Sequence, residues 1–221
     1  MNIKTFSVVL ISLIILVLTV VSAGAEKSNN PVIVEEDTLV ILAEEPETHF
    51  KAAHENFLKK DMKAAATEMR KGSAYLKMEA SRASGKTKEI LDASVRDLDG
   101  LADGVERGTV TSVRMIENAF AKAYYALAKH HYEKAEESFG KKTVKTVGHE
   151  LKAAALYLEK GLAWAGHKVE AGTATVIKKT RHLGGKLLEG TGWATTEVGK
   201  GISSLGGEVE KLGKKIKSAG K

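Results

Sequence analysis

The sequence contains no cysteine among its 221 residues. This absence excludes disulfide bonds, thiol catalysis, thiolate metal ligands and covalently attached haem, so stability must come from packing. A lipid anchor on an N-terminal cysteine is excluded for the same reason. The motifs of common enzyme classes are also missing: there is no P-loop, no Gly-x-Ser-x-Gly, no His-Glu-x-x-His and no Rossmann fingerprint. We therefore predict that the protein is not an enzyme.

Proline is almost absent, because the chain has only Pro31 and Pro46. From Glu47 onward no residue imposes the helix-breaking penalty of proline. Alanine, lysine and glutamate, which are good helix formers, are abundant there. This composition predicts an all-α fold, and apolar residues at helical spacing predict that its helices form a bundle.

The N-terminal residues have the pattern of a secretory signal peptide. One lysine, Lys4, precedes an apolar run over residues 6–21, and Ala-Gly-Ala at 23–25 supplies small residues for cleavage. We expect cleavage after Ala25 and a periplasmic or secreted protein, with an uncleaved membrane anchor as the alternative. Residues 26–45 then form an acidic lead-in, either two short extended segments or a disordered linker.

One helix–turn–helix unit is predicted to occur twice over residues 46–164, at about 48–84 and 118–164. An offset of 70 residues aligns the first helices and pairs the turn residue Asp61 with His131. An offset of 82 residues aligns the second helices. The difference predicts about twelve extra residues in the second copy, near Phe139 to Gly148.

The last segment, residues 165–221, is a basic tail with eleven Lys or Arg and five Asp or Glu. Its apolar residues from Val198 to Ile216 recur in steps of four and three, but glycine is frequent. The glycines predict a loosely ordered segment that becomes helical when its apolar stripe meets a surface. That surface is either the bundle itself or an anionic membrane. The predicted membrane or partner contacts are Lys178, Lys179, Arg181, Lys186, Trp193, Lys211, Lys214 and Lys215.

Seven histidines are present, but their spacing fits no metal-ligand motif. We therefore predict no metal and no cofactor. The alternative is a bundle that binds a small molecule, a metal or haem, with haem held between Met62 or Met69 and His54 or His131.

The repeated spacing of alanine, a large apolar residue and a turn residue has a counterpart in a known family. It is carried by Ala53, Phe57, Asp61, Ala65 and Met69 and by their copies Ala123, Leu127, His131, Ala135 and Phe139. This pattern, over about half of the chain after the signal peptide, resembles the YfdX family of exported bacterial helical proteins. The resemblance implies a role in stress or acid resistance without catalysis.

The basic tail and this resemblance together favour an exported, non-enzymatic protein of the envelope stress response. We expect it to bind a protein partner or an anionic membrane surface. Nucleic acid is not expected as a partner, and self-association is left open.

Overall fold

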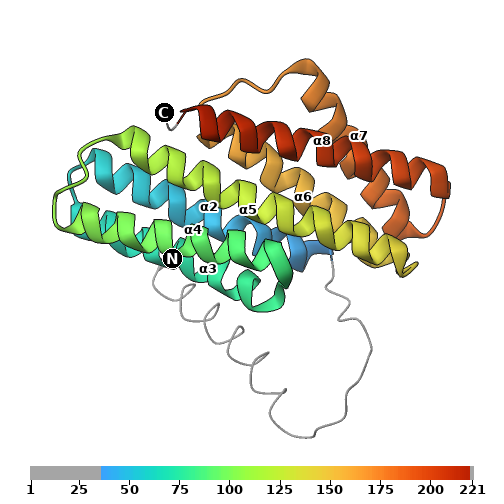
Figure 1. Cartoon of the computed structure of the whole chain (residues 1–221), viewed down its shortest axis with the longest axis horizontal. Helices are drawn as coiled ribbons and strands as arrows, with labels where there is room; N and C mark the ends of the chain where they lie inside the picture. Colours follow the sequence, from blue (N-terminus) through green and yellow to red (C-terminus); the bar gives the residue numbers. More distant parts are fainter. Residues whose placement is uncertain (1–35, 220–221) are drawn as a thin grey trace, which may run out of the picture. The chain divides into compact units, whose positions relative to one another are not determined.

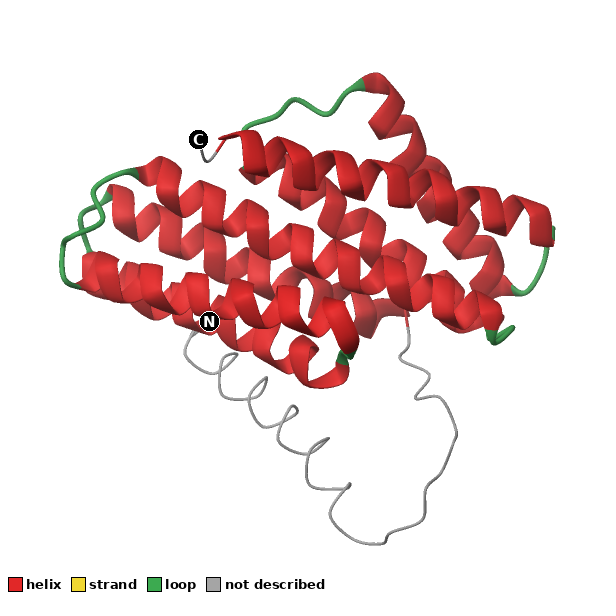
Figure 2. Cartoon of the chain, viewed as in Figure 1, coloured by secondary structure: helices red, strands yellow, loops and turns green. Residues whose placement is uncertain are grey.

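The computed structural model describes residues 36–219, which form helices connected by short loops and contain no strand (Figure 1, Figure 2). The helices are α2 (Glu36–Leu58), α3 (Met62–Arg82), α4 (Gly85–Glu106), α5 (Val113–Gly140), α6 (Val144–Trp164), α7 (Ala171–Glu189) and α8 (Thr195–Ala219). The predicted all-α helical bundle is confirmed. Within these residues no helix is long and apolar enough to cross a bilayer. The predicted signal peptide, residues 1–25, lies outside the described residues.

Helix α2 begins at Glu36, so Pro46 lies inside it and not in its first turn. The described part of the lead-in is therefore helical rather than extended. A proline inside a helix removes one backbone hydrogen bond. Leucine, alanine and glutamate on both sides of Pro46 favour the helix and let it continue.

The chain forms two hairpins, α2–α3 and α5–α6, whose turns are alike. Lys60 and Lys142 both adopt a left-handed conformation, with φ of 65° and 59°. The amide of Lys60 donates to the carbonyl of Phe57, and that of Lys142 donates to Phe139. Each of these residues lies 82 positions from its counterpart, so one offset relates the two hairpins.

The predicted turn at His131 and the predicted twelve-residue insert are therefore wrong. Helix α5 is continuous from Val113 to Gly140, and both His130 and His131 are buried within it. Helix α5 contacts α2, α3, α4, α6 and α8, so it is buried on more than one side. Apolar residues therefore occur at many positions along it. Several alignments of the two hairpins fit such a pattern, and the pattern alone did not select the correct one.

Helices α7 and α8 pack on this bundle and share its hydrophobic core. The apolar stripe of the basic tail faces inward: Val198, Ile202, Leu205, Val209, Leu212 and Ile216 are all buried. The stripe was predicted to meet either the bundle or an anionic membrane, and in the structure it packs on the bundle.

Several glycines of α7 and α8 lie where neighbouring groups approach the backbone. A Cβ at Gly206 would lie 2.6 Å from the ring of Tyr132, and a Cβ at Gly213 would lie 2.7 Å from the ring of Tyr125. Both tyrosines belong to α5. Because these glycines have no side chain, the two aromatic rings pack directly against the backbone of α8. The glycine content of the tail therefore reflects close packing here, in contrast to the loose order that the sequence suggested.

Candidate functional site

Each hairpin contains a histidine–glutamate pair in the same place. His49 Nδ1 lies 2.6 Å from Glu68 Oε2, and His131 Nδ1 lies 2.6 Å from Glu150 Oε2. Both pairs join residues 19 positions apart. Because an ionised carboxylate can only accept, the Nδ1–H of each histidine donates. The pair of the first hairpin is partly exposed, whereas that of the second is buried.

The second pair belongs to a larger group, which we call the buried histidine cluster: Glu79, His130, His131, Lys134 and Glu150. Lys134 Nζ contacts Glu150 Oε1 at 2.9 Å. Glu79 Oε2 lies 3.5 Å from His130 Nε2 and 4.0 Å from His131 Nε2, and neither Nε2 atom has hydrogen-bond geometry to a partner. Glu79, His130, His131 and Glu150 are each less than 9% exposed.

The electrostatics of the cluster keep both carboxylates ionised. Burial acts to raise the pKa of Glu150, but His131 and Lys134 outweigh it and lower that pKa to about 2. Burial likewise opposes ionisation of Glu79, yet His130, His131 and Arg82 lower its pKa below the ordinary value. Burial lowers the pKa of His130 and so favours its neutral form.

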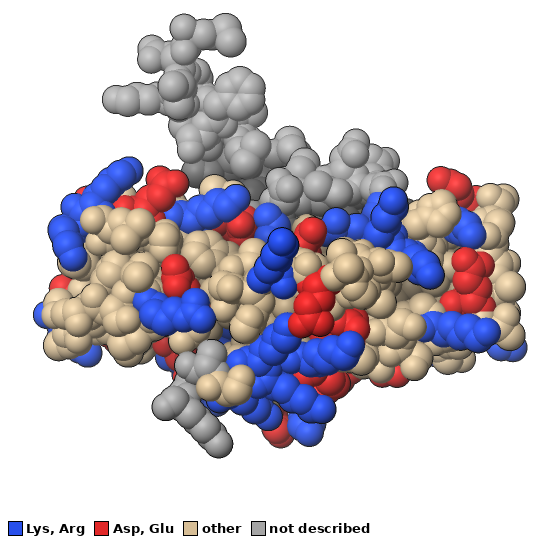
Figure 3. Space-filling model, turned by 90° about the horizontal axis from the view of Figure 1, so that it is seen from above, with Lys and Arg blue, Asp and Glu red and all other residues tan. Residues whose placement is uncertain are grey.

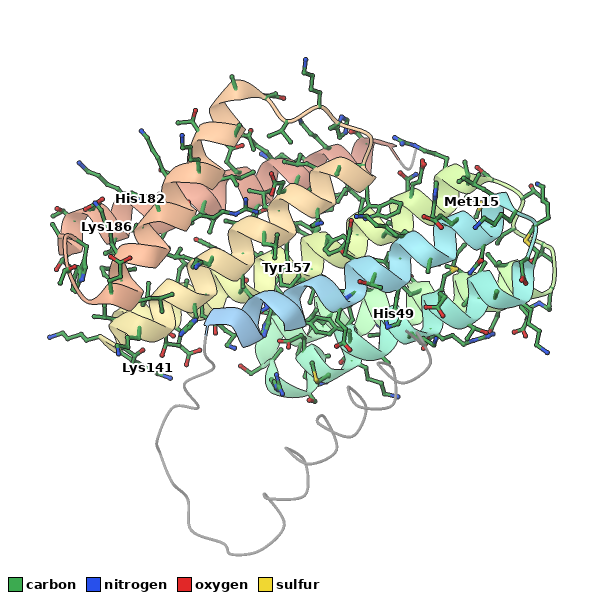
Figure 4. All side chains as sticks on the ribbon, turned by 180° about the vertical axis from the view of Figure 1, so that it is seen from behind. His49, Met115, Lys141, Tyr157, His182 and Lys186 are labelled. Carbon is green, nitrogen blue, oxygen red and sulfur yellow. The ribbon has the colours of Figure 1, made fainter. Side chains whose placement is uncertain are left out.

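Buried tyrosines add further polar groups to the interior of the bundle. Tyr75 and Tyr157, which occupy equivalent positions 82 residues apart, join their hydroxyl groups at 2.7 Å. Tyr124 donates to Glu47 Oε2 at 2.7 Å, and Trp164 Nε1 donates to the same atom at 3.1 Å. Burial raises the pKa of all three tyrosines, so they remain protonated. Figure 4 shows Tyr157 between the helices, in the core of the hairpins.

The paired hydroxyls should show strong energetic coupling. Tyr75→Phe leaves the buried hydroxyl of Tyr157 without its partner, which should cost about 1–3 kcal/mol of unfolding free energy. Tyr75→Phe/Tyr157→Phe should cost less than the sum of the two single changes. Urea unfolding of the four proteins measures the coupling. Additive losses would show that the hydroxyl pair contributes little.

The alternative metal and haem sites gain no support from the geometry. Within residues 36–219, no group of three or more His, Cys, Asp or Glu is arranged to hold a metal ion. Met69 is fully buried in the hydrophobic core. His54 lies 3.4 Å from Glu117 and packs edge-on against Trp164. Within the buried histidine cluster, Glu150 is held by the His131 hydrogen bond and the Lys134 ion pair.

The predicted contact residues of the tail fall into two groups. Four of them form ion pairs with carboxylates: Arg181 with Glu159, Lys186 with Glu197, Lys211 with Glu208 and Lys215 with Glu170. Lys178, Lys179 and Lys214 are exposed, and Trp193 is half-buried. Figure 3 shows lysines and arginines over the face that carries α7 and α8, interleaved with carboxylates.

A groove between α7 and α8, which we call the α7–α8 groove, gathers some of these cations. Its volume is about 600 Å³. Lys179, His182 and Lys200 line it together with the hydroxyls of Thr175, Thr196 and Ser204. Glu197 also lines it, but Lys186 pairs with that carboxylate at 3.2 Å. None of the three basic residues forms an ion pair within the described part of the chain. His182 was not among the predicted contact residues, although it lies three residues from Lys179 on α7; the packing of α8 against α7 brings Lys200 to both of them.

Comparison of the chain with protein-family models, with curated proteins and with solved structures gives no match. The resemblance to the YfdX family therefore stays a prediction.

Proposed function

We propose that this chain is an exported, non-enzymatic helical-bundle protein that binds an anionic, phosphate-bearing membrane surface through the α7–α8 groove. One observation carries the proposal. Lys179, Lys200 and His182 line the same groove, and none of the three forms an ion pair with a carboxylate among the described residues. The two lysines attract an anionic surface, and the attraction weakens with salt. The buried apolar stripe of α8 is consistent with adsorption through charge, without insertion.

The first experiment measures sedimentation with vesicles of phosphatidylcholine that contain phosphatidylglycerol, and with pure phosphatidylcholine vesicles as the neutral reference. Binding is expected only to the anionic vesicles, and it should fall as salt rises. Lys179→Glu/Lys200→Glu should weaken it by roughly 30-fold or more, because each lysine near such a surface contributes about 1 kcal/mol. The matched control is Lys63→Glu/Lys77→Glu, on α3, which contacts neither α7 nor α8.

Absence of binding, or an equal loss in the two double variants, would overturn this function. Binding to an acidic protein partner in place of vesicles is the competing outcome. Export is tested separately, since protein recovered from the cell envelope should begin at Glu26. A mature protein that retains residues 1–25 would contradict cleavage.

A further inference from the structure

An apolar pocket lies at one end of the bundle, where the α5–α6 turn meets the segment that joins α7 to α8. Its volume is about 380 Å³, within the range of small-molecule sites. We call it the end pocket. It is lined by Phe139, Lys142, Val144, Val147, Leu187, Trp193, Thr195 and Val198. Figure 4 shows Lys141 of the turn and Lys186 of α7 at this same end.

The floor and walls of the end pocket are hydrocarbon. Val147, Leu187 and Val198 are buried beneath it, each 1% exposed. Phe139 and Trp193 are only half-buried, although they pack against the core. Two large aromatic side chains therefore border the cavity and leave apolar surface for a ligand to cover.

The polar groups of the end pocket are few and carry one sign of charge. Lys142 is exposed and forms no ion pair within residues 36–219, and Thr195 supplies a hydroxyl. No carboxylate lines the pocket. A single cation beside a hydrocarbon cavity complements a ligand with an aliphatic chain and one carboxylate.

The first hairpin shows the equivalent turn with a more deeply buried phenylalanine. Phe57 and Lys60 occupy the places of Phe139 and Lys142, since both pairs lie at the equivalent turn. Phe57 is only 3% exposed, and Lys60 lies over its ring at 6.0 Å from the centroid. In the second hairpin Phe139 borders the cavity instead. The two turns share a backbone conformation, but Phe139 is less buried than Phe57 and borders a cavity.

We propose that the end pocket binds a medium-chain aliphatic carboxylate, with its chain beside Phe139 and Trp193 and its carboxylate at Lys142. This site is separate from the α7–α8 groove and does not depend on the function proposed there.

The probe is dodecanoate, added below its micellar concentration to purified protein that carries Trp164→Phe. Trp193 is then the only tryptophan, because the chain has two. A saturable change in its fluorescence is expected. Affinity should rise about fourfold for each added CH₂ until the cavity is filled. Lys142→Glu should weaken dodecanoate binding by at least tenfold and leave dodecanol binding nearly unchanged.

Two further variants separate this site from general adsorption. Lys60→Glu changes the equivalent turn of the first hairpin and should not alter dodecanoate binding. Val144→Phe fills the cavity and should abolish binding of both dodecanoate and dodecanol. Thermal unfolding confirms that each variant is folded. No saturable signal, or equal losses in Lys142→Glu and Lys60→Glu, would overturn the proposal, as would binding that Val144→Phe leaves intact.

Discussion

Gly148→Ala is expected to lower the free energy of unfolding by about 2–3 kcal/mol, despite the higher helix propensity of alanine. A Cβ at this position would lie 2.8 Å from the carbonyl oxygen of Gly184 and 3.1 Å from Leu187 Cβ. Neither group is the flexible end of a side chain, so relief requires α6 and α7 to separate. Their separation would disturb packing on both helices, which explains why the expected loss is large.

The control is Gly185→Ala, one residue beyond the contact. Apart from its chain neighbours and the backbone of its own helix, no atom lies within 4 Å of a Cβ placed there. Alanine should therefore raise the free energy of unfolding by about 0.5–1 kcal/mol. Urea unfolding of the three proteins gives both values. Equal effects at positions 148 and 185 would show that α6 and α7 do not approach as closely as described.

Acid should destabilise the protein through the buried histidine cluster. The pKa of Glu150 falls from its ordinary value of 4.5 to about 2 because His131 and Lys134 outweigh burial. This difference corresponds to about 3 kcal/mol of stability. A lowered carboxylate pKa means that this stability is present above pH 4.5 and is lost as the pH falls toward 2. Burial also lowers the pKa of His130 below 6.5, so the unfolded chain takes up that proton first and the loss begins below pH 6.5.

Glu150→Gln isolates the contribution of the carboxylate. At pH 7 it should cost about 3 kcal/mol, and it should flatten the dependence of stability on pH between 4.5 and 2. Glu89→Gln changes an exposed carboxylate and should leave the curve unaltered. The measurement is urea unfolding at a series of pH values. A Glu150→Gln curve parallel to that of the unchanged protein would contradict the assigned role of Glu150.

Features that depend on neighbours along the chain were predictable from the sequence. Asp61 was predicted as a turn residue, and its carboxylate accepts from the amide of Ala64 as the cap of α3. The stripe from Val198 to Ile216 was predicted as one apolar face, and it forms one buried face of α8. Of the eight predicted contact residues, Lys179 lines the α7–α8 groove and Trp193 lines the end pocket.

The sequence did not reveal which distant residues meet. His131 was assigned to a turn because an offset of 70 residues pairs it with the turn residue Asp61, yet it lies inside α5 and its Nδ1 bonds to Glu150. One signal was present, since His49 and Glu68 have the same spacing of 19 residues as His131 and Glu150. That spacing becomes meaningful only when the two turns are known to correspond.

The sequence by itself determined that this chain is helical, because propensity, the near absence of proline and apolar spacing act within a few residues. Only the tertiary structure decided that α5 is continuous and that a single offset of 82 residues relates the two hairpins. It also decided that glycines of the tail let neighbouring helices and aromatic rings pack against the backbone. The reason is physical. A glycine has the same local cost whether it is exposed or packed, and the approach of a neighbouring helix determines whether that cost is offset.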